Sequence, residues 1–339
     1  MLASRCGMHT VAEVLIKNGA DVNIVNKRGE TALSLACVND NFRIINVLLN
    51  GGAEIDKVNK DGETPLAIAC KGNIVSFIMS SIFQSFRASS NVESTDTRLE
   101  IIKLLLSRNA DVNKPTHDGS TPLMVACKWQ KADVVVMLLD KGACIQSKNN
   151  LGENALSIAC KNGRLKTVEV LLKHASNPNS LNDNECPLSE TVTNDSITQD
   201  VSRDDFEKIA QCLIDNGAEI DIADIDSWTP LMSACRGGLK NIAEMLIDHG
   251  ADVNAAANDG LTVLMLACMS GNKNVVDLVI DRNTINEREG RGWSALKYAC
   301  KLGHTTIVNT LLKHNADVNQ HDIEGGLHLC QHVNRVTNK

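Results

Sequence analysis

The chain has few aromatic residues, few prolines and no long apolar run. Phe, Trp and Tyr together make up 3% of its 339 residues, and there are six prolines. Its core must therefore be built from Leu, Val, Ile, Ala and Cys, which the 43% apolar share allows. The longest apolar clusters fall far short of the roughly 20 residues that span a bilayer. Because the first residues also lack a long apolar stretch, we expect neither a signal peptide nor membrane insertion.

Several patterns that carry chemistry are also absent. The sequence contains no G-x-x-x-x-G-K-S/T, no G-x-S-x-G and no C-x-x-C pair. Nothing therefore indicates phosphate binding, serine hydrolysis or a zinc ribbon. The net charge of −7 argues against binding nucleic acid by neutralising its phosphates. We expect a protein with no catalytic activity, no cofactor and no metal.

What the chain does contain is an Ala-Cys dipeptide that recurs seven times at the same place in the repeat. Three of the six intervals between these cysteines are 33 residues and one is 32, while the other two, 57 and 75, are one and two periods of 33 with 24 and nine extra residues. A fixed period near 33 indicates a stacked repeat array. The cysteines are Cys37, Cys70, Cys127, Cys160, Cys235, Cys268 and Cys300.

Each unit follows the pattern x-G-x-T-P-L-x-x-A-C-x-x-G-x-x-x-x-V-x-x-L-L-x-x-G-A-D-V-N. A clean start is Gly62-Glu63-Thr64-Pro65-Leu66, and a clean end is Gly250-Ala251-Asp252-Val253-Asn254. This pattern closely resembles the ankyrin repeat, and the resemblance covers nearly the whole chain. It implies an all-α solenoid of helix-turn-helix units with short β-hairpin-like turns between repeats.

The residues of the pattern support these elements on physical grounds. Thr64 stands where an N-cap oxygen is needed, and Pro65 follows at the first helical position, where no N–H is required. Thr121-Pro122 and Thr229-Pro230 repeat this pair, and Cys186 replaces the threonine before Pro187. We expect left-handed glycines to end the second helices at Gly19, Gly52, Gly142, Gly217 and Gly250.

We interpret the chain as a single solenoid over residues 1–339. Partial repeats at 1–23 and 323–339 flank about eight full units. Because terminal repeats normally carry polar caps and neither end shows a clear one, we expect a fragment or one end of a longer array. The units begin near Asn26, Asn59, Thr116, Asn149, Leu181, Asp224, Ala257 and Glu289.

The twelve cysteines do not indicate a disulfide framework. Equivalent cysteines lie one helix layer apart, about 10 Å, which is beyond the reach of a disulfide. We expect buried free thiols in a reducing compartment, the cytoplasm or the nucleus.

Two segments depart from the repeat. An insertion at about 74–97 contains an amphipathic pattern that predicts a short helix. This helix could pack back on the solenoid, or it could be a partner-binding element carrying Phe77, Phe83 and Phe86. The third interpretation is that the segment is a gene-model artefact. The second insertion, at about 189–205, follows a unit that has lost its Ala-Cys. It predicts either a solvated loop with a weakened first helix or an acidic contact loop.

Two columns of residues run along such an array. In the ankyrin family the residue before the Thr and those after Ala-Cys face a concave groove that binds partners. The first column changes from mainly Glu to Trp228, Leu261 and Trp293, and the second contains Arg236 and Lys301 near the C-terminus. Since Trp and Arg are enriched at binding hot spots, these five residues form a candidate binding patch. The alternative is that each Trp packs over its own hairpin.

The resemblance also implies a modification site. The Asn of Asp-Val-Asn resembles the residue that an asparaginyl hydroxylase modifies in many ankyrin proteins. In this chain a Leu lies eight residues before each candidate, whereas the alternative is that each asparagine bonds within its turn. The candidates are Asn23, Asn113, Asn254 and Asn319.

These observations predict a protein–protein interaction scaffold or adaptor that is monomeric and recognises an extended segment of its partner in a preformed groove. The alternative is the targeting or regulatory arm of a larger enzyme or channel, such as a kinase or ubiquitin ligase.

Overall fold

A computed structural model describes residues 1–72, 96–129, 132–174, 176–179, 186–192, 202–280 and 284–321. The chain divides into two compact units, Met1–Ser176 and Asn177–Lys339. The secondary structure over the described residues is made of helices, and an isolated antiparallel bridge joins Ala256 and Thr262. The expected all-α repeat architecture is therefore confirmed, while a single continuous solenoid over 1–339 stays a prediction.

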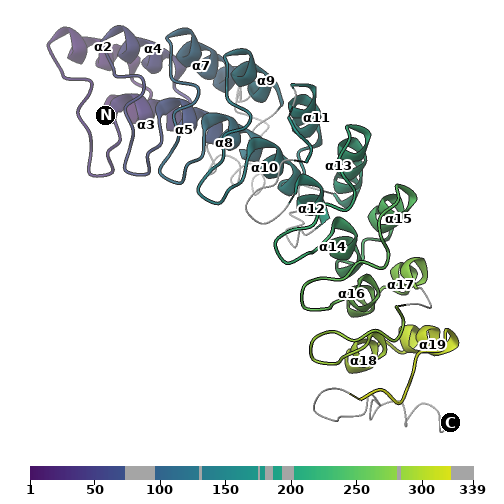
Figure 1. The fold of residues 1–339 in the computed structure, drawn as a ribbon. Helices are drawn as coiled ribbons and strands as arrows, with labels where there is room; N and C mark the ends of the chain where they lie inside the picture. The colour runs from purple at the N-terminus through teal and green to yellow at the C-terminus, as the bar shows by residue number, and fades with distance from the viewer. Residues whose placement is uncertain are drawn as a thin grey trace, which may run out of the picture. The chain divides into compact units, whose positions relative to one another are not determined.

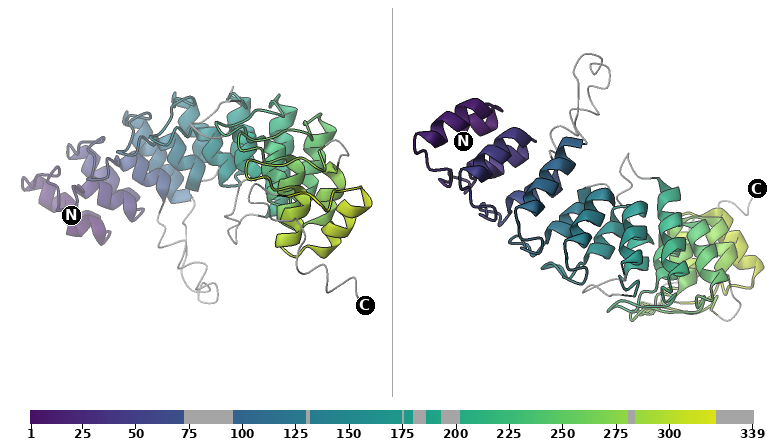
Figure 2. Two further views of the ribbon diagram at one scale, coloured as in Figure 1. Left: turned by 60° about the horizontal axis from the view of Figure 1, so that its bottom comes forward. Right: turned by 90° about the horizontal axis from the view of Figure 1, so that it is seen from above.

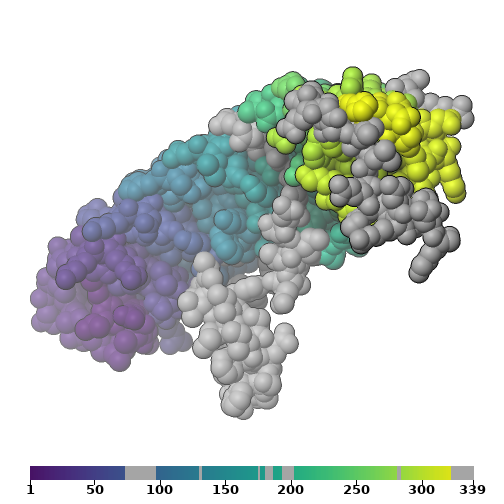
Figure 3. All heavy atoms as spheres, turned by 90° about the horizontal axis from the view of Figure 1, so that it is seen from below, coloured from purple at the N-terminus to yellow at the C-terminus, as the bar shows by residue number. Residues whose placement is uncertain are grey.

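The first unit is a two-layered stack of helix pairs. Figure 1 shows its first helices in one row and its second helices in another, and successive helices of each row pack together. Figure 3 shows one face of this unit, purple to teal, as a continuous packed surface. Its helices are α1 (Leu2–Arg5), α2 (His9–Lys17), α3 (Ala32–Val38), α4 (Phe42–Asn50), α5 (Pro65–Lys71), α7 (Asp96–Ser107), α8 (Pro122–Trp129), α9 (Ala132–Asp140), α10 (Ala155–Lys161) and α11 (Leu165–Lys173).

The second unit repeats the same arrangement. Each first helix packs against the second helix of its own pair and against the first helices of neighbouring pairs, which the two views in Figure 2 also show. Its helices are α12 (Pro187–Val192), α13 (Arg203–Asp215), α14 (Pro230–Arg236), α15 (Lys240–Asp248), α16 (Val263–Ser270), α17 (Lys273–Val279), α18 (Ala295–Lys301) and α19 (Thr305–Lys313).

Side-chain caps begin most of the first helices, as the sequence predicts. Thr64 Oγ1 accepts a hydrogen bond from the backbone N–H of Ala67 (3.1 Å), and Pro65 takes the first helical position. In α12 the sulfur of Cys186 accepts from the N–H of Ser189 (3.3 Å) in place of a threonine. Each cap satisfies an N–H that the helix itself leaves without a partner. Other threonine caps are Thr31, Thr121, Thr229 and Thr262.

The ends of the second helices follow the prediction as well. The glycine after each helix adopts a left-handed backbone, with φ between 83° and 91°. Only glycine takes this conformation without a steric penalty, so these positions stop the helix. The residues concerned are Gly19, Gly52, Gly142, Gly217 and Gly250.

The Ala-Cys cysteines pack inside the stack. All seven are buried free thiols, as predicted. Burial raises the pKa of Cys70, Cys235 and Cys268 to about 12 and also raises the pKa of Cys37 and Cys127. These cysteines therefore act as small apolar core residues beside Leu and Ile.

Hairpin-like turns precede the first helices and bond to one another along the stack. The N–H of Gly62 donates to the carbonyl of Asn59 (3.1 Å), and the N–H of His117 in the next turn donates to the carbonyl of Asp61 (3.1 Å). Gly62 is required at this tip because its φ is +77° and a Cβ atom would lie 2.5 Å from the His117 nitrogen. In the second unit Ser227 holds the equivalent tip position at φ +64°.

The insertion at 74–97 lies almost wholly outside the described residues. Its end merges with α7, which begins at Asp96, and Arg98 Nε in the first turn donates to Asp40 Oδ1 (3.0 Å). This contact ties α7 to the preceding repeat. The three aromatic residues proposed as a partner-binding element lie outside the described residues: Phe77, Phe83 and Phe86.

The insertion at 189–205 begins within the first helix, since α12 ends at Val192. Residues 193–201 and the partial repeat at 323–339 lie outside the described residues. The second helix begins at Arg203, where Ser202 and Asp205 form a reciprocal cap before α13. The Ser202 Oγ accepts from the N–H of Asp205 (3.2 Å), and the Asp205 carboxylate accepts from the N–H of Ser202 (3.1 Å). Asp205 therefore has a capping role at a helix N-terminus, where a carboxylate is favoured.

Candidate functional site

Two positions of each repeat meet on one face of each unit. One is the residue before the helix cap, at the end of the hairpin, and the other follows Ala-Cys eight residues later. We call the surface made by these two positions the ladder face. In the first unit its pairs are Glu30/Val38, Glu63/Lys71, Ser120/Lys128 and Glu153/Lys161, and in the second unit they are Trp228/Arg236, Leu261/Met269 and Trp293/Lys301.

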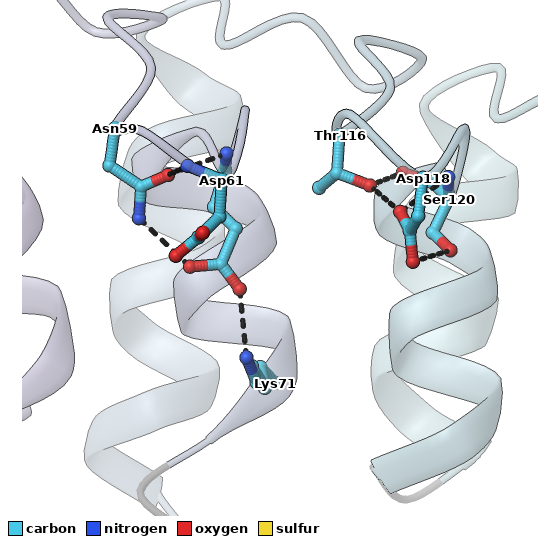
Figure 4. Close-up of polar contacts among 7 residues, drawn as sticks. Asn59, Asp61, Lys71, Thr116, Asp118 and Ser120 are labelled. Carbon is cyan, nitrogen blue, oxygen red and sulfur yellow. Dashed lines mark hydrogen bonds and ion pairs between the residues drawn. The ribbon is translucent and has the colours of Figure 1, made fainter. Parts of the chain in front are cut away.

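In two repeats of the first unit the ladder face carries an ion pair that a third residue supports. Lys71 Nζ lies 2.9 Å from Glu63 Oε1, and Asn59 Nδ2 donates to Glu63 Oε2 (2.9 Å). Asn59 Oδ1 in turn accepts from the backbone N–H groups of Asp61 and Glu63, both at 2.9 Å. Figure 4 shows this chain of contacts from Asn59 to Lys71. The carboxylate is thus satisfied entirely within its own repeat.

The same triad recurs two repeats later. Asn149 Nδ2 donates to Glu153 Oε2 (2.9 Å), and Lys161 Nζ lies 2.9 Å from Glu153 Oε1. Burial alone would raise the pKa of the Glu153 carboxyl, but the hydrogen bonds from Asn149 and Lys161 and the charges of Lys161 and Lys128 bring it below its usual value. The folded repeat therefore favours the ionised carboxylate.

The repeat between these two has a different set of side-chain hydrogen bonds in its hairpin. The hydroxyls of Thr116 and Ser120 both donate to the Asp118 carboxylate, as Figure 4 shows. Burial alone would raise the pKa of Asp118, and the hydrogen bonds from Thr116 and Ser120 lower it overall. With Ser120 in place of Glu on the ladder face, Lys128 lies over the ring of Trp129, 5.3 Å from its centroid.

In two repeats of the second unit tryptophan takes the place of the carboxylate. Arg236 lies over the ring of Trp228, with Cζ 5.4 Å from the centroid. Trp293 has two cations over its ring, Lys297 at 4.5 Å and Lys301 at 4.4 Å. Both tryptophans are half-buried, so the structure places each ring at the surface beside its own cation. Cation–π contacts of this kind hold both partners in a defined arrangement.

Tyr298 completes the aromatic cluster around Trp293. The two ring centroids lie 5.2 Å apart with the planes tilted by 56°, a geometry that aromatic pairs favour. Burial raises the pKa of Tyr298, and the charges of Glu289 and Asp259 add to this effect while Arg291 opposes it. The tyrosine is therefore neutral over the physiological pH range.

The residue that starts the hairpin changes together with the ladder face. In the second unit Asp224 Oδ1 accepts from the N–H of Trp228 (2.8 Å), and the Glu289 carboxylate accepts from the N–H of Trp293 (3.2 Å). An asparagine stands here when the ladder residue is Glu, because its NH₂ can donate to that carboxylate. Sequence reasoning missed this third column, and the i, i+4 pairing of Asn59 with Glu63 is the signal that could have revealed it.

Leu261 and Met269 form the middle pair of the second unit. Both are half-buried, and both belong to the repeat between the two tryptophans, whose first helix α16 packs against α14 and α18. The repeat order therefore places an apolar pair between Trp228/Arg236 and Trp293/Lys301. Sequence reasoning named Leu261 but did not include Met269, Lys297 or Tyr298 in the patch.

Two of the candidate hydroxylation residues, Asn23 and Asn113, bond beyond their own turns. Asn23 Nδ2 donates to the carbonyl of Gly52 (3.0 Å) and its Oδ1 accepts from the N–H of Glu54 (2.8 Å), both in the next repeat. Asn113 makes the same two bonds to its following repeat. In Asn254 and Asn319 the backbone N–H donates within the turn, to Oδ1 of the aspartate two residues earlier (2.9 Å in both).

Over the described residues, no group of three or more His, Cys, Asp or Glu side chains could hold a metal ion. In the same residues no helix is long and apolar enough to cross a membrane.

A family model described as ankyrin repeats (three copies) matches residues 1–90, 88–182, 196–257 and 254–322. No curated protein compared with the chain matches it. Since the family matches cover well over half of its length, the chain belongs to the ankyrin repeat family.

Proposed function

We propose that this ankyrin repeat protein binds another protein through the ladder face of its second unit, at Trp228, Leu261, Trp293, Arg236 and Lys301. Ankyrin repeats are in general protein–protein interaction modules and are typically non-catalytic. The observation that carries the proposal is the pair of half-buried tryptophans, each stacked with a cation.

Two physical effects support this choice of surface. A large ring that is half-buried in the free protein can lose its remaining exposed area on binding, and such Trp and Arg residues are enriched among binding hot spots. The cation over each ring also fixes the rotamers of both side chains, so binding orders few additional groups. In two repeats of the first unit the ladder residues already satisfy one another, as Glu63 with Lys71 and Glu153 with Lys161, and these repeats offer less to a partner.

A scaffold or adaptor role follows from the same reasoning, because the surface is a preformed platform. We propose that the protein acts as a monomer in the cytoplasm or the nucleus. The buried free thiols support a reducing compartment.

The test is affinity capture with the full chain, followed by binding measurements with the purified partner. The double variant Trp228→Ala/Trp293→Ala should lose capture, since each hot-spot residue contributes roughly 2 kcal/mol or more. The matched control Glu63→Ala/Glu153→Ala removes the equivalent residues of the first unit and should retain capture. If the tryptophan variant binds normally while the control does not, the site lies in the first unit.

We also propose that Asn23, Asn113, Asn254 and Asn319 are substrates of an asparaginyl hydroxylase. The amide of Asn23 bridges two repeats, so a repeat would have to open locally before the enzyme could reach it. Peptides from cells should carry an added mass of about 16 Da at these positions. Unmodified peptides at all four would refute the proposal.

A further inference from the structure

We infer that the second unit's ladder face binds an acidic, extended segment of its partner that presents an apolar side chain between two carboxylates. This inference rests on the proposed function and adds the chemistry of the partner. It comes from the charges that the second unit leaves unsatisfied, and from the order of the three repeats that carry Trp228, Leu261 and Trp293.

The cations of the second unit lack the carboxylates that their counterparts have. Lys71 and Lys161 each lie 2.9 Å from a glutamate of their own repeat. Within the part of the chain that the structure describes, Arg236 and Lys301 have no carboxylate at ion-pair distance, and tryptophan rings are their neighbours instead. A ring covers one side of a cation and leaves its N–H donors able to bind a carboxylate.

The nearby acids do not neutralise these cations. The carboxylates of Asp224 and Glu289 accept backbone N–H groups at the start of their hairpins. Asp259 Oδ1 likewise accepts from the N–H of Leu261 (3.0 Å). These carboxylates are hydrogen-bonded to the backbone of their own hairpins and form no ion pair with Arg236 or Lys301. The ladder face therefore carries positive charge at Arg236 and Lys301.

The spacing of the cations defines the segment. Arg236 ends α14 and Lys301 ends α18, with α16 between them, which corresponds to about 20 Å at about 10 Å per helix layer. An extended chain advances about 3.3 Å per residue, so carboxylates roughly six residues apart would reach both cations. Leu261 and Met269 lie in the intervening repeat and would receive an apolar side chain from the middle of the segment.

A protein segment fits this face better than a nucleic acid. Nucleic-acid binding needs a basic surface that neutralises many phosphates, whereas this chain has a net charge of −7 and carboxylates in each hairpin of the second unit. Two isolated cations around an apolar pair match sparse carboxylates. A single-stranded oligonucleotide of similar length is therefore the competitor to include.

The experiment is selection of random peptides of about 12 residues, long enough to span the three repeats at about 3.3 Å per residue, displayed on phage against the full chain. We expect enriched peptides with Asp or Glu on both sides of a central Leu, Ile or Met. Replacing the acids of a selected peptide with their amides should weaken binding about tenfold or more, equal to about 1.4 kcal/mol. Arg236→Gln and Lys301→Gln should each weaken it to a similar degree, while Lys71→Gln and Lys161→Gln should leave it unchanged.

The remaining outcomes separate this inference from the proposed function. Selected peptides could be neutral or basic, bind the full chain and fail to bind Trp228→Ala/Trp293→Ala. This result would support the proposed binding face and refute the acidic partner. Peptides that bind equally well to the tryptophan variant, or no enrichment at all, would refute both. Tighter binding of the oligonucleotide than of any acidic peptide would also overturn the inference.

Discussion

The two units place opposite chemistry at the same positions of one fold. In the first unit Glu63 and Lys71 neutralise each other at 2.9 Å, whereas in the second Trp228 lies under Arg236 and leaves its charge available. Beneath these residues the structure is the same, since Thr64 and Thr229 cap equivalent helices. The comparison teaches that the caps and the core hold the repeat, so the ladder face is free to vary with the partner.

The comparison also shows that hairpin and ladder residues depend on each other. Asn59 supports Glu63 through its NH₂ group, whereas Asp224 stands before Trp228 and needs only to accept N–H groups. A change at one position therefore has consequences at the other. The predictions below test these differences, beginning with the largest expected effect.

The cysteines give the largest expected contrast, because the seven cysteines at the repeated Ala-Cys position of the first helices are buried while Cys144, after α9 in the first unit, is exposed. Hydrogen bonds from the Ser147 side chain and the Gln146 backbone lower the pKa of Cys144, whereas burial raises the pKa of Cys70 to about 12. Alkylation of the native protein near pH 7 should therefore modify Cys144 roughly 100-fold faster or more. Peptide mass spectrometry over time measures this ratio.

A matched variant tests the cause. Ser147→Ala removes one hydrogen bond and should raise the pKa of Cys144, so its labelling near neutral pH should slow while the Ala-Cys thiols stay protected. Rapid native labelling of the Ala-Cys cysteines in either unit would contradict the packing described above.

The hairpin tips give the largest expected change in stability. Gly62→Ala introduces a side chain at φ +77° with its Cβ 2.5 Å from the His117 nitrogen, and should cost about 2–4 kcal/mol in the free energy of unfolding. Gly52→Ala is the control, because its φ is +83° but no atom lies within 4 Å, so it should cost about 1–2 kcal/mol. Urea unfolding of both variants measures the difference, and equal losses would show that the contact between hairpins does not matter.

The second unit offers the reverse change at a tip. Ser227 holds a left-handed conformation at φ +64°, so Ser227→Gly should relieve about 1 kcal/mol of strain. The loss of the hydrogen bond from Ser227 Oγ to Asn258 Oδ1 (2.7 Å) opposes this gain. A lower stability than the parent chain would mean that this exposed bond outweighs the strain.

Exchanging the ladder chemistry tests the link between hairpin and ladder. Trp228→Glu brings a second carboxylate beside Asp224 and should destabilise the repeat by about 1 kcal/mol. Adding Asp224→Asn should recover most of this loss, because the amide can donate to the new carboxylate as Asn59 does to Glu63. The two single variants and the double variant form a cycle, and additive effects would show that the two columns are independent.

The smallest expected effect concerns pH. The pKa of Glu153 is lowered in the folded chain, so its contribution to stability is full above the unfolded-state value of about 4.3 and is lost as the pH falls through the folded value. Glu153→Gln should therefore be less stable than the parent at pH 7 by roughly 0.2–1 kcal/mol, since Lys161 is largely solvent-exposed. The gap should close below about pH 4, and a constant gap would exclude the ion pair as its cause.

Most of the fold could be predicted from the sequence because the repeat fixes it locally. Thr64, Pro65 and Gly52 act through backbone rules that hold wherever these residues occur. The buried cysteines followed from their period. The cap of α13, Ser202 with Asp205, was not predicted because it lies in the second insertion, outside the repeat pattern.

The site was less predictable because its contacts cross between columns or repeats. The sequence indicated Trp228 and Arg236 as neighbours, but Lys297 over Trp293 depends on a rotamer that no pattern encodes. The bonds from Asn23 to the following repeat were missed for a similar reason, since the turn was considered alone.

The most direct test of the central claim is hydrogen exchange of the full chain with and without a bound partner. The account predicts slower exchange in the second unit, at residues 224–236 and 289–301, with no change at residues 59–71 and 149–161 in the first. Protection confined to the first unit would contradict the assignment of the binding face to Trp228 and Trp293.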